Sequence, residues 1–193
     1  LSEVSNGATS GKIGKQMEAI KISLKNVPYT GGISYSVHVQ DIGWQNFVSN
    51  GSLGGTTGKN KQLEAIQIKL TDEMEKNFDV YYRVYSEGYG WLGWAKNGES
   101  AGTQGFARQM EAIQIVLVEK GGKAPGLTEK PFITKPSISY STHVQNSGWT
   151  NEVKDGAISG TTGQAKPLNG IKVSLNNTVY SGSVTYKTLI KGV

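Results

Sequence analysis

ISYSVHVQDIGWQNFVSNGSLGGTTGKNKQLEAIQIKL, residues 33–70, is the stretch that decides the fold, because the rest of the chain repeats it. Val80 begins a diverged version and Ile138 begins a close one. The chain opens on the second half of another version and closes, from Val184, on a first half. We call residues 1–24, 33–70, 80–117 and 138–175 the first, second, third and fourth copies. Self-similarity at a fixed period is the signature of a repeat architecture.

The chain begins and ends at nearly the same phase of the repeat. Leu1 falls just after the place of a tryptophan, and Val193 falls just before the place of a Gly-Trp pair. Two interpretations remain open. The chain is a piece of a longer array, or it is a unit whose two ends complete each other.

Each copy carries the alternation that is typical of half-buried strands. Ile33, Tyr35, Val37 and Val39 alternate with polar residues, and Met17–Leu24 ends in a second alternating run. Met17 and Ala19 have the opposite parity to Ile20, so we expect a β-bulge between Ala19 and Ile20 that turns both sets inward. A helix is the competing reading of the LEAI segments, but the flanking glycines and β-branched residues favour a strand. Asn50-Gly51 predicts a hairpin turn.

These signals predict an all-β protein built from tandem repeats of about 45 residues, each with three or four short antiparallel strands. One insertion interrupts the period. The tryptophans of the copies are 47 residues apart between Trp44 and Trp91 but 58 apart between Trp91 and Trp149. We therefore predict a first block at residues 1–120, a Pro/Gly-rich linker at 121–136 and a second block at 137–193; a long surface loop is the alternative to the linker. Grouping in threes predicts a β-prism- or β-trefoil-like arrangement.

The composition excludes several classes of protein. The chain has 193 residues, no cysteine and no apolar run near the roughly 20 residues of a membrane span. We therefore expect no disulfide, no thiol nucleophile and no membrane insertion. The net charge is +5, but the lysines are spread along the chain instead of forming a stripe. Such diffuse charge suits an anionic cell surface better than nucleic acid.

No enzyme signature is present. The only histidines, His38 and His143, occupy the same position in two copies, so they do not converge on one site. Glu18, Glu64 and Glu111 are likewise equivalent to one another, which argues against a paired acid and base. We expect a non-catalytic protein without a metal or cofactor, in which these glutamates brace turns.

The combination of HVQDIGW, NG, GTTG and LEAIQIKL resembles the ChW repeat, the clostridial hydrophobic repeat with a Gly-Trp pair. The resemblance covers nearly the whole chain. It implies tandem repeats in a secreted or surface protein of clostridia or their relatives, where such repeats accompany hydrolases or adhesion modules and bind a substrate or a cell surface. The third copy departs from the pattern, with Tyr85, Ser86 and Glu87 in place of HVQ.

We expect the tryptophan common to the copies, Trp44, Trp91 and Trp149, to fill the core, with an exposed sugar platform as the alternative. Trp94 aligns with Phe47 and Glu152, so we expect it to be at least partly exposed and to form an apolar patch with Tyr89 and Tyr85. The candidate ligand-binding residues are Trp94, Tyr89, Tyr85, His38, Gln40, His143 and Gln145.

The sequence therefore predicts a binding module that anchors a secreted protein to cell wall, polysaccharide or another surface ligand. The alternative is a structural subunit that assembles head to tail into a fibre or surface layer through its repeat edges. The expected partner is a surface polysaccharide, or else a protein partner or a second copy of the chain.

Overall fold

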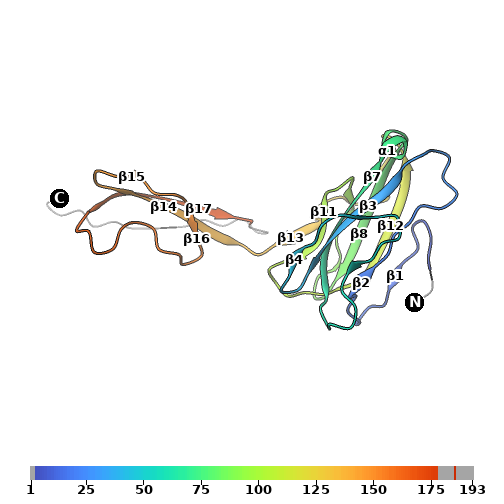
Figure 1. The fold of residues 1–193 in the computed structure, drawn as a ribbon, viewed down its shortest axis with the longest axis horizontal. Helices are drawn as coiled ribbons and strands as arrows, with labels where there is room; N and C mark the ends of the chain where they lie inside the picture. The colour runs from blue at the N-terminus through green and yellow to red at the C-terminus, as the bar shows by residue number, and fades with distance from the viewer. Residues whose placement is uncertain (1–2, 178–184, 186–193) are drawn as a thin grey trace. The chain divides into compact units, whose positions relative to one another are not determined.

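A computed structural model describes residues 3–177 and residue 185. Seventeen strands and a single short helix, α1 (Asp72–Asn77), make up its regular structure, so the all-β prediction is confirmed (Figure 1). The closing half-copy from Val184, including Leu189, Ile190 and Lys191, lies outside the described residues except for Thr185.

Every complete copy folds in the same order. It begins with a long front strand: β3 (Gly32–Val39), β8 (Phe78–Ser86) or β14 (Ser137–Val144). A two-residue Gly-Trp strand follows: β4 (Gly43–Trp44), β9 (Gly90–Trp91) or β15 (Gly148–Trp149). Next comes a two-residue turn strand: β5 (Val48–Ser49), β10 (Ala95–Lys96) or β16 (Val153–Lys154). A long back strand ends the copy: β7 (Leu63–Thr71), β12 (Met110–Glu119) or β17 (Leu168–Asn176).

The front strand organises each copy, because it pairs antiparallel with the other three strands. In the second copy β3 pairs with β4, β5 and β7, and the third and fourth copies repeat this pattern around β8 and β14. Within the first three copies, β3 and β7 are neighbours in one sheet, β8 and β12 are neighbours in a second sheet, and β7 contacts β8 between the two sheets.

The tight turn predicted at Asn50-Gly51 is present and recurs in the other copies. It does not close a hairpin, because β5 pairs with β3 and the following strand β6 (Gly54–Gly55) pairs with β2 (Ala19–Ile20) of the first copy. Asn50 and Gly51 have φ of 43° and 82°, the left-handed values that a tight hairpin turn requires. The Asn50 side chain also accepts the backbone N–H of Ile33 at 3.0 Å. Asn97 and Asp155 make the equivalent bonds to Val80 and Ile138 at 2.9 and 3.0 Å. The turn residue therefore clamps the start of its own front strand.

The back strands contain a β-bulge, but it lies one residue earlier than the aligned copies predict. The register shifts where His38 and Val39 face Ala65 and Leu63, which leaves Glu64 unpaired. A second shift isolates Glu111 in β12. The bulge has the predicted effect, since Leu63, Ala65, Ile66, Ile68 and Leu70 are all buried.

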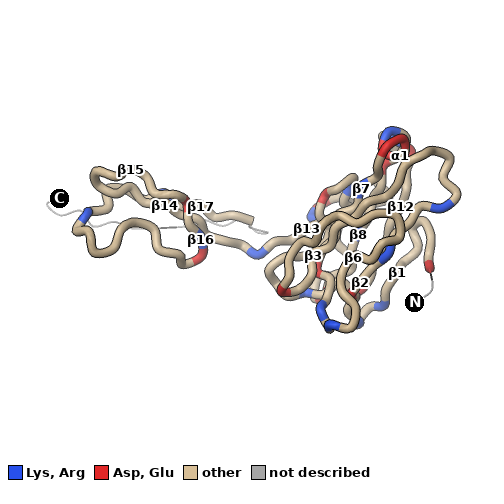
Figure 2. Tube along the Cα trace, in the orientation of Figure 1, with Lys and Arg blue, Asp and Glu red and all other residues tan. Residues whose placement is uncertain are grey.

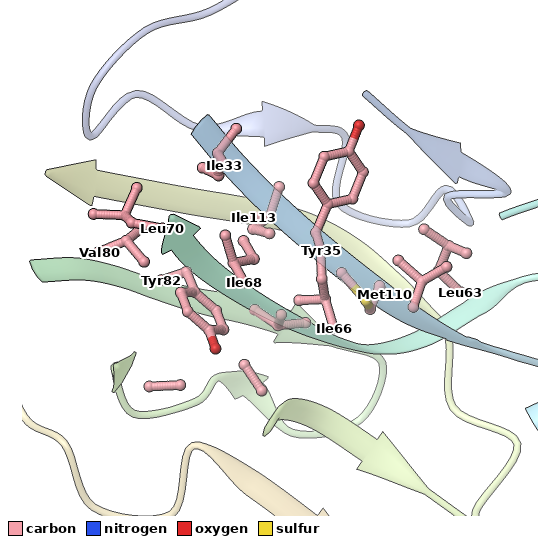
Figure 3. Packing of buried hydrophobic residues seen from close by; sticks show 14 of the residues in the cluster. Ile33, Tyr35, Leu63, Ile66, Ile68, Leu70, Val80, Tyr82, Met110 and Ile113 are labelled. Atoms are coloured by element: carbon pink, nitrogen blue, oxygen red, sulfur yellow. The ribbon is translucent and has the colours of Figure 1, made fainter. Parts of the chain in front are cut away.

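In the first copy, the predicted strand Met17–Leu24 is reduced to β2 (Ala19–Ile20). Its apolar side chains nevertheless pack against the core. That core draws on the second and third copies and includes the fully buried Tyr35 and Tyr82 (Figure 3).

Short bridging strands join the first three copies to one another. β6 (Gly54–Gly55) of the second copy pairs with β2, and β11 (Ser100–Gln104) of the third copy pairs with β7. β1 (Ser10–Gly11) of the first copy pairs with β12 of the third. The pairing of the first three copies is therefore cyclic.

A backbone hydrogen bond recurs at each of these three junctions. Gly51 donates to Ile22, Gly98 to Ile68 and Gly7 to Ile115, at 2.8, 2.7 and 2.7 Å. The cyclic pairing joins the first three copies into one set. It does not establish a β-prism or β-trefoil, because the first copy contributes only its second half, and that assignment stays a prediction.

The chain divides into two compact units, residues 1–133 and 134–193. The boundary lies inside the segment predicted as a linker, residues 121–136, and most of that segment belongs to the first unit. β13 (Phe132–Thr134) adjoins β11, and Ile133 is buried. The prediction of a linker from residue 121 is therefore wrong: the insertion supplies backbone and apolar groups that extend the first unit.

Candidate ligand-binding surface

The Gly-Trp strand gives each tryptophan a fixed partner on the front strand. Gly43, Gly90 and Gly148 have positive φ of 87°, 76° and 79°, which glycine adopts without strain. The chain therefore turns back at once, so that Trp44 pairs with His38, Trp91 with Tyr85 and Trp149 with His143.

The three tryptophans pack in the same way on these partners. The ring centroids are 5.5 Å apart for His38 and Trp44, 5.6 Å for Tyr85 and Trp91, and 5.4 Å for His143 and Trp149. Each pair is T-shaped, the arrangement that favours the quadrupoles of two aromatic rings. The indole is therefore held rigidly in all three copies, and Tyr85 does in the third copy what histidine does in the others.

These tryptophans do not fill the core. Trp44 and Trp91 are half-buried and lie outside the buried core cluster, while Trp149 is 46% exposed. The prediction that they are core residues is wrong, because the Gly-Trp strand is an outer strand that pairs only with the front strand. The alternative interpretation was a platform on which a sugar packs, and such a platform requires rigid indoles that a ligand can reach.

Trp94 is also placed differently from the prediction. It is 5% exposed, so the expected partial exposure is wrong. Its backbone N–H donates to the carbonyl of Leu127 at 2.9 Å, and Gly126 lies against its indole nitrogen. The inserted segment therefore covers it. Trp94 belongs to the structural framework of the third copy.

The patch predicted from Trp94, Tyr89 and Tyr85 is not formed as expected. Tyr89 is 42% exposed, and its ring lies 6.0 Å from that of Phe106. Tyr85 is half-buried against Trp91. Tyr85 and Tyr89 therefore serve two separate aromatic pairs.

His38 is more buried than expected. It is 9% exposed, and its Nδ1 lies 3.1 Å from the Oε2 atom of the buried Glu64. Little of His38, a candidate ligand-binding residue, is therefore accessible to a ligand. In the fourth copy Asn169 replaces this glutamate. Nδ1 of the half-buried His143, like that of His38, makes no hydrogen bond with good geometry to any residue that the structure describes.

The other candidates contribute mainly through their backbones. Gln40 N–H donates to the Gln62 carbonyl, and Gln145 N–H to that of Pro167, both at 3.0 Å. Gln40 is half-buried and Gln145 is exposed. These bonds fix the loop between the front strand and the Gly-Trp strand, and the Gln145 side chain remains accessible to a ligand beside Trp149.

Glu64 and Glu111 occupy the bulges, and all three repeated glutamates bind nearby polar groups. Glu111 accepts the backbone N–H of Gly14 at 2.8 Å, so this carboxylate braces a turn of the first copy. A glutamine two residues earlier donates to the glutamate in each case: Gln16 to Glu18, Gln62 to Glu64 and Gln109 to Glu111. Buried carboxylates need such donors.

Asp79 is a buried acid that the sequence analysis missed. Its side chain is 1% exposed, and its carboxylate lies 2.8 Å from the Lys96 ammonium and 3.2 Å from that of Lys120. Asn97 and the backbone N–H of Gly121 also donate to it, at 2.7 and 2.9 Å. Burial alone raises the pKa of a carboxyl group, but these donors outweigh it and hold the pKa of Asp79 well below its usual range. The arrangement is a structural ion-pair network, not an acid–base pair.

The sequence analysis also missed the cations that lie over aromatic rings. The Arg83 guanidinium carbon is 4.6 Å from the centroid of Trp91 and 4.9 Å from that of Trp94. Lys172 Nζ lies 4.2 Å from the ring of Trp149. Alternation along β8 and β17 could have shown that these cations face outward, but not which ring each one covers.

A metal site and a membrane helix are both absent from residues 3–177. No group of three or more His, Asp and Glu side chains in this range is arranged to hold a metal ion. No helix found there is long and apolar enough to cross a membrane.

Comparison with known proteins gives one finding. The family model described as clostridial hydrophobic W (ChW) matches residues 38–72, 85–119 and 143–177. Each match begins at the residue that packs on the tryptophan: His38, Tyr85 or His143. No curated protein and no solved structure matches the chain.

Proposed function

The chain belongs to the ChW family, and from that premise we propose that it is a non-catalytic module that holds a secreted protein on a cell wall or surface polysaccharide. The observation that carries the proposal is the repeated tryptophan, which lies outside the core in every complete copy and packs on the aromatic residue opposite it on the front strand. Trp44 also lies 6.4 Å from the ring of Phe132. A buried tryptophan would have had a sufficient structural explanation. A rigid, accessible one fits the stacking of an aromatic ring on a sugar.

Polar groups beside the tryptophans would supply the hydrogen bonds. Gln145 is exposed in the loop that leads to Trp149, and Asn46 is exposed two residues after Trp44. Several weak sites on one chain reinforce each other when the ligand is itself a repeating polymer. This reasoning favours a wall or polysaccharide over a small soluble ligand.

A sedimentation assay on purified clostridial walls, together with a glycan array, tests the proposal. We expect the whole chain to be retained by walls or by at least one polysaccharide. Size-exclusion chromatography at several protein concentrations is run in parallel. Absence of retention together with concentration-dependent self-association would reject a binding module in favour of the head-to-tail assembly.

A further inference from the structure

Each complete copy places a cation over an exposed or half-buried aromatic ring near its Gly-Trp strand. Lys69 Nζ lies 4.5 Å from the centroid of Phe47, in addition to the pairs formed by Arg83 with Trp91 and by Lys172 with Trp149. All three distances are within the roughly 6 Å reach of a cation–π contact.

The three cations come from positions that are not equivalent in the repeat. Arg83 is on a front strand, where the second and fourth copies have Ser36 and Ser141. Lys69 and Lys172 are on back strands but at different positions. Each complete copy therefore has a cation over an aromatic ring, but the cation comes from a different position in each copy. Duplication of the repeat alone does not explain this recurrence.

None of the three cations is neutralised by a carboxylate. Among the described residues, no Asp or Glu oxygen lies within 4.0 Å of Lys69, Arg83 or Lys172. Arg83 directs Nε to Gln114 at 2.8 Å, which leaves its terminal nitrogens available. Lys69 and Lys172 are exposed. By contrast, Lys96 and Lys120 are both paired with the carboxylate of Asp79.

We propose that these three cation–aromatic pairs are subsites for an anionic polysaccharide, in which the ring packs on a sugar and the cation binds a carboxylate or phosphate group. The inference rests on the proposed function and narrows its ligand class. Charge complementarity supports it, because the net charge is +5 and the lysines and arginines are spread over the chain (Figure 2). A charged group on the polymer would gain a charge-assisted hydrogen bond at each subsite.

The test measures binding of the whole chain to three immobilised polymers: polygalacturonate, a glycerol-phosphate teichoic acid and neutral mannan. The first two separate the carboxylate source of charge from the phosphate source. We expect at least about tenfold tighter binding to one of them than to mannan. We also expect this preference to disappear at about 1 M salt, where the screening length is about 3 Å.

The matched variants change charge in two different places. The subsite variant carries Lys69→Gln, Arg83→Gln and Lys172→Gln. The control carries Lys12→Gln, Lys59→Gln and Lys154→Gln, three exposed lysines that remove the same charge. We expect the subsite variant to lose about tenfold or more in affinity for the anionic polymer. The control should lose less than about threefold, the effect of long-range charge alone. Circular dichroism verifies that both are folded.

The failures of the two proposals are distinguishable. Equal binding to mannan and to the anionic polymers, or equal losses in the two variants, overturns the inference and leaves the surface-binding function in place. Absence of binding to all three polymers and to walls overturns both. Immobilised double-stranded DNA is measured as a further comparison. Tighter binding to it than to either anionic polysaccharide also overturns the inference, because the positive charge would then serve nucleic acid.

Discussion

The backbone N–H of Trp94 donates to the carbonyl of Leu127 at 2.9 Å, so the extra tryptophan of the third copy lies under the extra segment that follows this copy. Arg83 is layered between Trp94 and Trp91, with its guanidinium carbon within 5 Å of both ring centroids. The buried ring of Trp94 therefore helps to hold the Arg83 guanidinium over the half-buried ring of Trp91.

Removal of Trp94 should destabilise the first unit. We expect Trp94→Ala to lower the free energy of unfolding by about 3–5 kcal/mol, the usual cost of deleting a buried aromatic side chain. Urea unfolding measures this change. Tyr89→Ala is the control, and it should cost less than about 1 kcal/mol because Tyr89 is exposed. Equal effects of the two substitutions would contradict the placement of Trp94.

The position of Trp94 also shows a limit of repeat alignment. The aligned residues, Phe47 and Glu152, are exposed in their own copies, and the alignment extended that property to Trp94. The insertion that covers Trp94 has no counterpart in the other copies. The extra tryptophan lies in the third copy and the insertion follows that copy directly, and this proximity was the sign in the sequence that the two belong together.

Three glycines hold the copies together, and substituting any of them should break a junction. Gly11, Gly55 and Gly102 have φ of 108°, 108° and 118°. A Cβ atom on Gly102 would overlap the Glu64 carbonyl oxygen, which combines a steric clash with backbone strain. We expect Gly102→Ala to cost about 3 kcal/mol or more.

The control for this effect is Gly58→Ala. Gly58 has φ of 66° but no atom near the added Cβ, so it should cost about 1–2 kcal/mol from strain alone. Thermal unfolding separates the two variants. A Gly102 variant as stable as the Gly58 variant would show that the bridging strand does not need so close an approach.

The front-strand tyrosine should contribute to stability only where it is buried. Tyr82 donates to the Glu99 carbonyl from a fully buried ring, and burial raises the pKa of its phenol. Tyr82→Phe should cost about 1–3 kcal/mol, because it removes a hydrogen bond that a fully buried side chain makes. Tyr140→Phe removes the equivalent bond to Ala157 at a more accessible site and should cost less than about 1 kcal/mol. Similar losses in guanidinium unfolding would contradict this distinction.

The Asp79 network should make stability depend on acidity. The pKa of Asp79 is lower in the folded chain than its usual value of 3.8. Its ionised form therefore stabilises the fold above about pH 4, and this contribution is lost as the pH falls through the folded-state pKa. We expect Asp79→Asn to lower stability by about 2–3 kcal/mol at pH 7.

At pH 2 the gap between wild type and Asp79→Asn should be smaller, because Asp79 of the wild type is then protonated in the unfolded chain and its ionised form no longer contributes its full stabilisation. Urea unfolding at several pH values measures both gaps. Glu119→Gln, which alters an exposed acid, is the control and should show no such convergence. A gap that stays constant from pH 7 to pH 2 would show that packing, not charge, accounts for the loss.

The sequence predicted the strands and turns well, because alternation and Asn-Gly pairs are local signals. It did not predict the cyclic pairing of β1 with β12, since Ser10 and Ile113 are far apart in the chain and carry no local mark of their contact. It misplaced the common tryptophan for a different reason. A tryptophan that recurs in every complete copy could be either a core residue or part of a repeated contact surface. The structure favours the contact surface, because the strand that carries Trp149 pairs with β14 alone.

The most direct test of the account is the retention of tryptophan variants on purified clostridial walls. Trp149→Ala removes a 46% exposed side chain, and Ile158→Ala removes a 78% exposed one from the same copy as a control. A variant with alanine at Trp44, Trp91 and Trp149 removes all three platforms.

We predict that retention falls severalfold for Trp149→Ala and is lost in the triple variant, while Ile158→Ala is retained as well as wild type and circular dichroism remains that of a β protein. A folded triple variant that is retained as strongly as wild type would contradict the claim that the repeated tryptophans form the binding surface.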